Sequence, residues 1–287
     1  MKKFCIITNQ DKDYDFSVTV QIAKYVKEQG GECFLAPILL DEYENNYTDS
    51  SVIPKDTECA IVLGGDGTII QAANDLLERQ IPIVGINLGT LGFLAEVELH
   101  QMEKVLELLM NDEYEIDRRA MLQGKIVNGS SESYQGLALN DIVITRAGFS
   151  RVITMDVYVN SKNVTSYRGD GVVISTPTGS TGYNLSAGGP VITPNTDALV
   201  ITPICPHALG ARSIVVSATD EIKVKIGKSK KTQSEEAYAT FDGRKAIQLK
   251  TEDEVVIRKA TEDTRLLKVS DKSFFDILRT KLGECIR

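Results

Sequence analysis

Two kinds of apolar pattern alternate along residues 1–118. Short, continuously apolar runs at Phe4–Thr8, Cys59–Leu63 and Ile83–Ile86 are typical of strands that are buried on both faces of a parallel sheet. Apolar residues that recur every three to four positions predict helices over Phe16–Glu28 and Met102–Met110. Strands that alternate with helices in this way favour a parallel sheet with helices on both of its faces.

The pattern changes near Arg118, after which helical periodicity fades. Short β-rich runs then follow one another as far as about Val269, which predicts an all-β domain of two packed sheets. Helical spacing returns over Phe274–Leu282, and we expect this helix to pack back on the first domain. The expected fold is therefore a Rossmann-like α/β domain over residues 1–118, a β-sandwich over residues 119–269 and a C-terminal helical segment over residues 270–287.

The composition fits a folded protein and argues against several classes of partner. A length of 287 residues suggests two domains, and 42% apolar with 25% charged residues is ordinary for a globular chain. The net charge is -8 and no dense Lys/Arg cluster occurs, which argues against a nucleic-acid partner. No window approaches the roughly 18 apolar residues that a membrane helix needs, and the apolar stretch Phe4–Ile7 is too short for a signal peptide.

Five cysteines are scattered through the chain, and none forms a CxxC pair. Their odd number and wide spacing indicate neither a disulfide framework nor a zinc site. Thiols that serve as small hydrophobes fit a reducing compartment, so we expect a cytoplasmic protein with no membrane partner.

A glycine-rich turn, Gly64-Gly65-Asp66-Gly67-Thr68, joins the run Cys59–Leu63 to a predicted helix over Thr68–Arg79. In a parallel sheet this turn lies at the carboxyl edge, where glycines and a helix N-terminus together favour phosphate. We expect Thr68 to cap the helix. A carboxylate at Asp66 would repel phosphate, so its presence suggests work on a hydroxyl or a metal. The alternative is a tight turn in which Asp66 and Thr68 are only capping residues.

A second polar cluster lies within the β-rich part of the chain. Asn140-Asp141 stands between two apolar runs, where the carboxylate of Asp141 can accept both hydroxyls of a ribose while the Asn140 amide orients a neighbouring group. The alternative is an exposed strand end.

The segment Ser175–Pro190 is rich in hydroxyl groups and glycine, and Arg168-Gly169-Asp170-Gly171 precedes it by one strand. Such a composition offers hydrogen bonds and close backbone contact to a polar ligand, and Tyr183 adds a stacking face. The alternative is a flexible Ser/Gly linker.

Taken together, these motifs resemble the NAD kinase family in their order and spacing. The resemblance covers most of the chain, from about Cys59 to Phe241. The matching segments are Gly64–Thr68, Asn87–Leu94, Asn140-Asp141, Gly169–Gly171, Thr176–Pro190 and Thr202–His207.

The resemblance implies an α/β nucleotide domain followed by a β-sandwich that binds NAD. It also implies transfer of the γ-phosphoryl group of ATP, or of polyphosphate in some members, to the 2′-hydroxyl of the adenosine ribose of NAD, which gives NADP. Family members need Mg²⁺ or Mn²⁺ and form homo-oligomers, either dimers or tetramers. The sequence shows no cluster of carboxylates that could enclose a metal ion. We therefore expect the metal to be bound by the ATP phosphates rather than by protein ligands.

The resemblance assigns residues by position. Asp66 corresponds to the catalytic carboxylate. This chain departs from the common pattern at three sites, with Asp141 where Glu is more frequent and with Gly182 and Asn184 where Ala and Ser are common. The implied binding residues are Gly67, Phe93, Asn140, Asp141, Arg151, Arg168, Asp170, Thr181, Gly182, Tyr183, Asn184, Leu185, Ser186, Asp242 and Arg244.

Two other functions use part of the same pattern. Diacylglycerol and sphingosine kinases share a turn like Gly64–Thr68, although they would not require the segment Thr178–Pro190. A non-catalytic NAD(P) sensor would keep the binding residues, although an intact Asp66 argues against it. The sequence leaves open the choices between ATP and polyphosphate, between NAD and NADH, and between dimer and tetramer.

Overall fold

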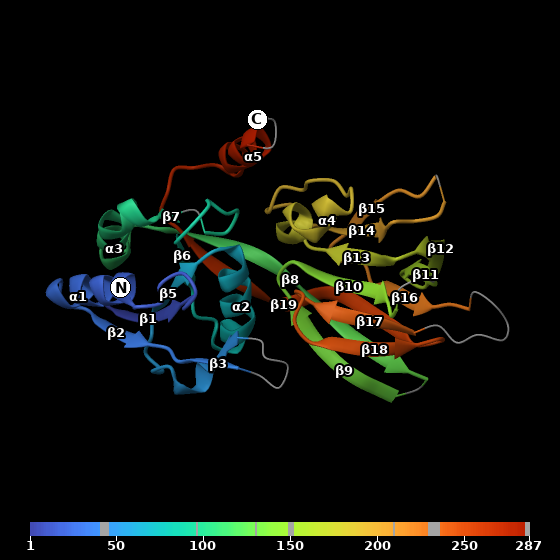
Figure 1. Cartoon of the computed structure of the whole chain (residues 1–287), viewed down its shortest axis with the longest axis horizontal. Coiled ribbons are helices and arrows are strands. Elements are labelled where there is room, and N and C mark those ends of the chain that lie inside the picture. The colour runs from blue at the N-terminus through green and yellow to red at the C-terminus, as the bar shows by residue number, and fades with distance from the viewer. Residues whose placement is uncertain are drawn as a thin grey trace. The chain divides into compact units, whose positions relative to one another are not determined.

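The structure, a computed structural model, describes residues 1–40, 46–95, 97–129, 131–148, 152–208, 210–228 and 236–284. The chain forms two compact units (Figure 1). Unit 1 comprises Met1–Arg119 together with Thr264–Arg287, and unit 2 comprises Ala120–Asp263. Unit 1 is thus assembled from two separate stretches of sequence, and its second stretch contains the C-terminal helix α5 (Phe274–Glu284).

The centre of unit 1 is a parallel sheet whose strands follow the order β2-β1-β5-β6. Strands β1, β5 and β6 carry the three apolar runs predicted from the sequence, and nearly all of their residues are buried. β6 also pairs in parallel with β7 and, at Leu266, with β19. The strand bounds are Lys3–Thr8 for β1, Glu32–Leu35 for β2, Cys59–Gly64 for β5, Ile83–Asn87 for β6 and Val97–Glu98 for β7.

Helices cover both faces of this sheet because successive strand side chains point to opposite sides. Helices α1 (Ser17–Glu28) and α3 (Met102–Met110) share one apolar cluster with Ile6 and Ile61. Helix α2 (Asp66–Leu76) packs on the opposite face against β5 and β6. A small hairpin of β3 (Ile38–Leu40) and β4 (Asn46–Thr48) stands apart from the main sheet.

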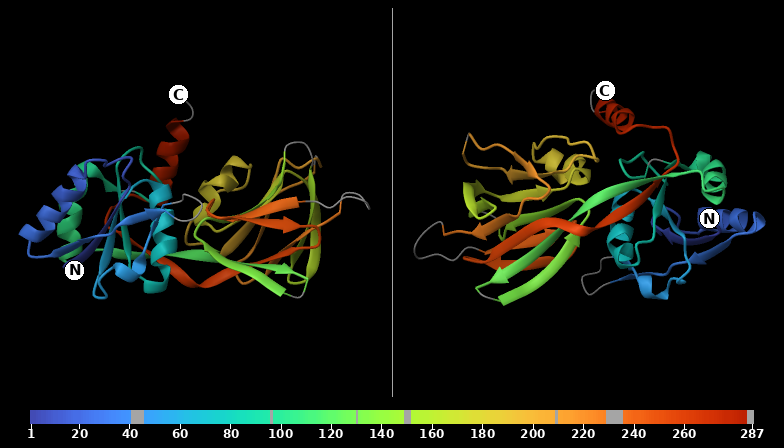
Figure 2. Two further views of the ribbon diagram at one scale, coloured as in Figure 1. Left: turned by 60° about the horizontal axis from the view of Figure 1, so that its bottom comes forward. Right: turned by 180° about the vertical axis from the view of Figure 1, so that it is seen from behind.

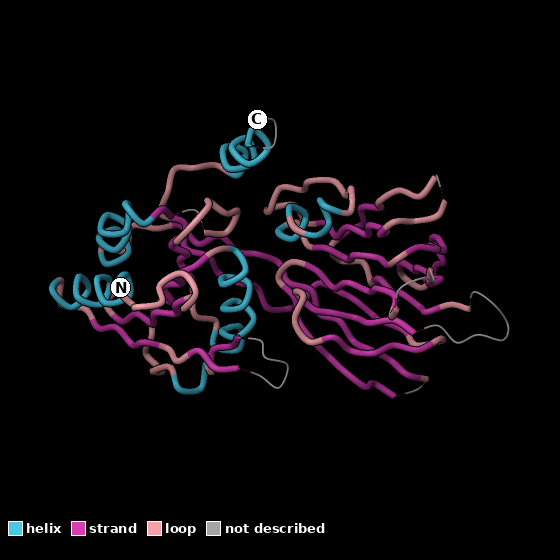
Figure 3. Tube along the Cα trace, viewed as in Figure 1, coloured by secondary structure: helices cyan, strands magenta, loops and turns pink. Residues whose placement is uncertain are grey.

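Unit 2 is built from two facing layers of antiparallel strands. One layer is the six-stranded sheet β15-β14-β13-β10-β17-β18, and the other contains β12, β11, β16 and β19 with β8 and β9. Among the described residues of unit 2, Figure 3 shows strands and loops apart from the adjoining 3₁₀ turn Thr178–Thr181 and short helix Tyr183–Ser186. The bounds are β8 Glu115–Asn128, β9 Ser131–Ala138, β10 Asp141–Arg146, β11 Ile153–Val159, β12 Lys162–Gly169, β13 Gly171–Ser175, β14 Ala198–Ile204, β15 Ile214–Ser217, β16 Ile222–Ile226, β17 Glu236–Phe241, β18 Ala246–Lys250 and β19 Glu254–Lys268.

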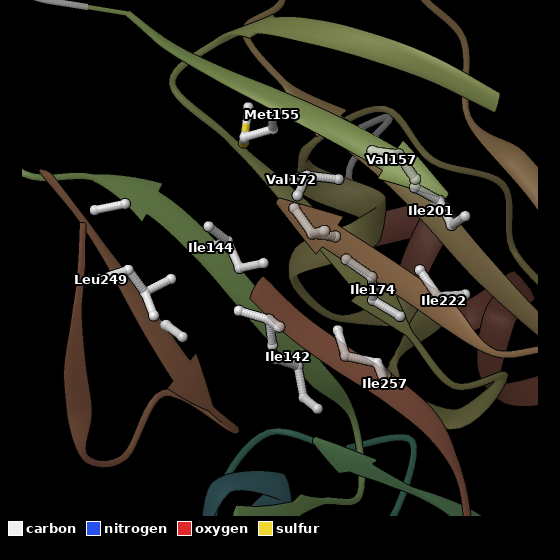
Figure 4. Close-up of a cluster of buried hydrophobic side chains, with 14 of the residues drawn as sticks. Ile142, Ile144, Met155, Val157, Val172, Ile174, Ile201, Ile222, Leu249 and Ile257 are labelled. Atoms are coloured by element: carbon white, nitrogen blue, oxygen red, sulfur yellow. The ribbon is translucent and has the colours of Figure 1, made fainter. Parts of the chain in front are cut away.

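The apolar core of unit 2 lies between these layers. Alternate residues of each strand point inward, so Ile142 and Ile174 from the six-stranded sheet meet Val157, Ile222 and Ile257 from the other layer (Figure 4). All of these side chains are fully buried. The fold class expected from the sequence, an α/β part followed by a β-sandwich and a C-terminal helix, is therefore confirmed.

Two long strands, β8 and β19, pair with each other and contain residues of both units (Figure 2). After β19 the chain enters α5. The ring of Phe274 lies 5.9 Å from that of Phe93, and Lys272 pairs with Glu98 at 2.9 Å. As expected, α5 contacts the first unit, and it does so next to the loop that follows β6. Among the described residues, no helix is long and apolar enough to span a membrane.

Gly85 of β6 offers a test of the packing on the α2 face. A Cβ atom at this position would lie 2.2 Å from Cδ1 of Ile69 and 3.3 Å from the Cα of Ala95. We expect Gly85→Ala to lower the free energy of unfolding by about 1–3 kcal/mol, as overpacking of a filled core does. Thermal unfolding measures the loss. Gly210→Ala, where a Cβ would meet no atom within 4 Å, is the control, and equal melting temperatures for the two variants would contradict the packing described here.

Candidate active site

The glycine-rich turn of unit 1 joins buried strand β5 to helix α2. Gly65 occupies the N-cap position, Asp66 is the first helical residue, and no side chain caps the helix. The prediction that Thr68 caps α2 is therefore wrong. Its hydroxyl accepts a hydrogen bond from Nδ2 of Asn9 at 3.2 Å instead, and it lies so close to Gly64 that a Cβ there would approach it to 2.3 Å.

The carboxylate of Asp66 accepts hydrogen bonds from three successive backbone N–H groups of the loop after β6. Oδ2 accepts from Phe93 at 2.8 Å, and Oδ1 accepts from Leu94 at 3.0 Å and Ala95 at 3.1 Å. Gly92 makes this approach possible, because a Cβ there would lie 1.9 Å from Oδ1. A carboxylate offers about four acceptor positions, so these three bonds leave about one, at Oδ2, for a hydroxyl.

The start of α2 also presents groups suited to an anion. The first N–H groups of a helix have no acceptor within it and carry the positive end of its dipole. Gly67 is exposed, and a Cβ on it would meet no protein atom within 4 Å. The space around Gly67 is therefore open to a ligand. Phe93 is half-buried, with its ring beside Phe274 and its N–H directed to Asp66.

Sequence reasoning assigned no role to three polar residues at the ends of the strands beside β5. Asn9 and Lys12 follow β1, and the N–H of Asn9 bonds to the carbonyl of Leu63 at 2.8 Å. Asn87 ends β6 directly opposite Gly64. The rule that ligands bind at the carboxyl edge applies to all three adjacent strands, so polar residues after each apolar run were the available clue.

In unit 2, the carboxylate of Asp242 holds the turn that contains Asn140 and Asp141. It accepts hydrogen bonds from the N–H groups of Leu139 at 2.6 Å, Asn140 at 2.8 Å and Asp141 at 3.1 Å. Asp242 itself has a left-handed backbone, with φ of 50°. We therefore describe Asp242 as a residue that positions the Asn140-Asp141 pair.

The side chains of Asn140 and Asp141 each have a property that a bound ligand would change. Oδ1 of Asn140 is buried and has no hydrogen-bond partner among the described residues. Asp141 is only 6% exposed, and burial, assisted by the nearby charge of Asp242, raises its pKa to about 7. A bound ligand that donates hydrogen bonds would satisfy the Asn140 oxygen and favour the charged form of Asp141.

The segment Ser175–Pro190 is an ordered part of unit 2. Thr176 donates its hydroxyl to the carbonyl of Leu139 at 2.7 Å, and Ser180 donates to that of Pro177 at 2.6 Å. Asn184 is fully buried, with Nδ2 bonded to two carbonyls and Oδ1 accepting from Thr202 at 2.6 Å. These inward bonds contradict the flexible-linker alternative, and they give the Asn184 side chain a role in holding the segment together.

The other predicted binding residues of this segment are partly or fully exposed. Tyr183 is 43% exposed and its pKa is raised, mainly by burial of the hydroxyl. Leu185 and Ser186 are exposed, Gly182 is the N-cap of α4 (Tyr183–Ser186), and Thr181 donates its hydroxyl to the carbonyl of Thr178 at 3.3 Å.

The remaining predicted binding residues are charged. Asp170, between β12 and β13, accepts from Nε of Arg146 at 2.7 Å, while Arg168 is exposed near the end of β12. Arg244 lies in the turn after Asp242, and its N–H bonds to the carbonyl of Phe241. Arg151 lies outside the described residues.

Comparison with known proteins identifies the family. Residues 4–114 match the ATP-NAD kinase N-terminal domain, and residues 139–269 match the ATP-NAD kinase C-terminal domain. The chain belongs to the ATP-NAD kinase family. The resemblance noted in the sequence is thereby confirmed.

Full-length relatives agree with this assignment. An NAD kinase of Lachnoclostridium phytofermentans is 50% identical over 286 residues, which cover 99% of this chain and 100% of that protein. An NAD kinase of Lachnospira eligens is 42% identical, with 98% and 100% coverage. An NAD kinase from Archaeoglobus fulgidus, solved in complex with ATP, matches with a TM-score of 0.78 at 25% identity and covers 98% of each chain. Yeast NADH kinase shares the fold, with a TM-score of 0.79 at 24% identity over 99% of this chain and 88% of its own.

Membership of the ATP-NAD kinase family has a direct consequence for activity. The chain is a phosphotransferase with an alcohol acceptor, and its reaction is the phosphorylation of NAD to NADP. The comparisons favour neither a lipid kinase nor a non-catalytic sensor.

The raised pKa of Asp141 makes a prediction about stability. Its pKa is about 7 when folded against an ordinary value of 3.8, so ionisation destabilises the folded state progressively as pH rises between these values. Asp141→Asn removes that cost. We expect the free energy of unfolding of the variant, relative to the parent protein, to rise by at most about 1.4 kcal/mol per pH unit from pH 4 to 7 and then to level off. Urea unfolding of both proteins across this pH range measures the difference in their free energies of unfolding. A difference that stays constant with pH would contradict the raised pKa of Asp141.

Proposed function

We propose that this chain transfers the terminal phosphoryl group of ATP to the 2′-hydroxyl of the adenosine ribose of NAD, with Asp66 as the base. One observation carries the role of Asp66. Its carboxylate stands at the start of α2, is fixed by the N–H groups of Phe93, Leu94 and Ala95, and keeps about one acceptor position open at Oδ2. Such a group can orient a hydroxyl and accept its proton.

Phosphoryl transfer to a hydroxyl depends more on positioning of the reactants than on covalent catalysis. A ribose hydroxyl is a weak nucleophile, and phosphoryl transfer depends on alignment and on neutralisation of charge. A base that accepts the hydroxyl proton contributes about 10²–10⁴-fold to such a rate. Because three amides hold Asp66, its carboxylate is preorganised and needs no rearrangement when the substrate hydroxyl arrives.

For the acceptor, we propose that Asn140 and Asp141 bind the adenosine ribose and that Tyr183 stacks on an adjoining ring. The unsatisfied Oδ1 of Asn140 and the buried carboxyl of Asp141 both suit a ligand that donates hydroxyl groups. Asp141 is one methylene shorter than the Glu found more often here, so we expect a water molecule or a shifted strand to complete one contact. The other residues proposed to line the nucleotide sites are Gly67, Phe93, Arg151, Arg168, Asp170, Thr181, Gly182, Leu185, Ser186 and Arg244. Asn184 and Asp242 are proposed to support these sites through the hydrogen bonds described above.

A divalent cation, Mg²⁺ or Mn²⁺, would neutralise charge on the ATP phosphates. Among the described residues, no group of three or more His, Cys, Asp or Glu side chains could hold a metal ion. We therefore propose that phosphate oxygens supply most of its ligands. We also propose that residues 1–118 bind ATP, that residues 119–269 bind NAD, and that the protein works in the cytoplasm as a homo-oligomer.

Asp66→Asn tests the base. The amide cannot accept a proton, and its NH₂ group would face backbone N–H groups, so we expect loss of most NADP formation from ATP, Mg²⁺ and NAD, by about 10²-fold or more. NAD binding, measured by calorimetry, should persist. Asp112→Asn, which removes an exposed carboxylate from the same unit, is the matched control. Near-normal turnover of Asp66→Asn would contradict the role, and side-by-side assays with lipid and NAD as acceptors test the acceptor class.

The Asp141 carboxyl predicts how NAD binding varies with pH. Ribose hydroxyls donate to the ionised form, which predominates above its pKa of about 7. We therefore expect NAD to bind more tightly at pH 8 than at pH 6, by as much as about tenfold per pH unit below 7. Calorimetry without ATP measures this dependence. The same pH dependence in Asp141→Asn would show that another group is responsible.

A further inference from the structure

A lysine that the proposed function does not yet use lies over the glycine-rich turn of unit 1. Lys12 follows β1, and its Nζ is 3.1 Å from the point where a Cβ on Gly65 would stand. The same nitrogen is 3.2 Å from the corresponding point on Gly89, in the loop after β6. The ammonium group is thus located where β1, β5 and β6 all end, beside backbone that carries no side chains.

The charge of Lys12 is not neutralised by any carboxylate within the described part of the chain. Its neighbour Asp13 is directed elsewhere, since Oδ2 accepts from both the N–H and the hydroxyl of Thr19 at the start of α1. The carboxylate of Asp66 is held by the backbone of Phe93 and the two residues after it. In a protein of net charge -8, an uncompensated cation at this edge leaves a local site for an anion.

A second, independent observation comes from Asn87. This residue is only 4% exposed, and its Oδ1 accepts from the N–H of Gly89 at 2.8 Å. Its Nδ2 is buried and has no hydrogen-bond partner among the described residues. The point above Gly89 that lies 3.2 Å from Nζ of Lys12 also lies 3.9 Å from Oδ1 of Asn87, so the two side chains are neighbours. Buried donors are almost always paired, which indicates that an acceptor belongs here.

We propose that Lys12 and Asn87 bind phosphate oxygens of the nucleoside triphosphate donor; this inference rests on the proposed function and adds a subsite to it. A flexible ammonium, an amide donor and the N-terminal N–H groups of α2 present donors from three adjacent strand ends. Only a ligand with several anionic oxygens can use all of them at once. Gly65 and Gly89 leave room for such a ligand to approach the backbone.

The competing assignment is the pyrophosphate of NAD, which has the same chemistry. Steady-state kinetics separates the two. We expect Lys12→Met to raise the KM for ATP by about tenfold to a hundredfold, the range that loss of a hydrogen bond between charged groups produces, and to leave the KM for NAD within about twofold. Lys12→Arg should retain most of the ATP affinity. Lys27→Met is the matched control, because it removes one exposed lysine charge from α1 in the same unit.

Asn87→Asp tests the second donor. An aspartate keeps the acceptor for the N–H of Gly89 and replaces the unpaired donor with an oxygen that repels phosphate. We expect a higher KM for ATP in this variant also, with thermal unfolding recorded alongside to show that it folds. A raised KM for NAD with an unchanged KM for ATP, or no change in either constant for Lys12→Met, would overturn the proposal.

Calorimetry with inorganic tripolyphosphate as the probe keeps this inference separate from the proposed function. If the parent protein made no NADP from ATP and NAD, the proposed function would fail while the subsite could still be judged. Tripolyphosphate binding that weakens about tenfold or more in Lys12→Met, with no change in Lys27→Met, supports the subsite. Equal tripolyphosphate affinity in the parent protein and in Lys12→Met overturns it.

Discussion

The candidate site of unit 1 depends on the hydrogen bonds between the Asp66 carboxylate and the backbone of Phe93, Leu94 and Ala95. A partly buried carboxylate must find donors, and three amides in a row supply them without any side chain. The same bonds tie the loop after β6 to the first turn of α2, so the shape of the loop and the direction of the carboxylate are set together. Gly92 completes the arrangement because no larger residue fits against Oδ1.

Unit 2 also contains a carboxylate that accepts hydrogen bonds from three successive backbone N–H groups, but its role is different. Asp242 accepts hydrogen bonds from three successive N–H groups, those of Leu139, Asn140 and Asp141, and thereby fixes the turn before β10. In unit 1 the carboxylate that is held is itself the proposed reacting group. In unit 2 the carboxylate holds other residues in place, and its charge adds to the burial that raises the pKa of Asp141. Hydrogen bonds from backbone to carboxylate thus hold the proposed base in unit 1 and support a turn in unit 2.

Local sequence patterns were sufficient for the fold class and for the buried strands of unit 1, and they singled out the segments that form the two candidate sites. The apolar runs predicted β1, β5 and β6, and the polar pair Asn140-Asp141 stood out because it interrupts such a pattern. What local patterns could not show is which groups meet across the fold. Asp66 is 27–29 residues away from its donors, and Asp242 is 101–103 residues away from its own. The prediction for Thr68 failed because α2 begins at Asp66, with Gly65 as its N-cap, so Thr68 lies within the first turn of the helix.

The discontinuity of unit 1 has a consequence for how the protein is made. Residues 264–284 supply Leu266 as a partner of β6, Leu267 to the apolar cluster under α1 and α3, and Phe274 to the ring of Phe93. A ribosome delivers these residues only after all of unit 2. When residues 1–263 have been synthesised, the first stretch of unit 1 still lacks Leu266 beside β6 and the Phe274 ring beside Phe93. Unit 1 can therefore be completed only after unit 2 has been synthesised, and Phe274, which contacts the loop that holds Asp66, is among the last residues to be made.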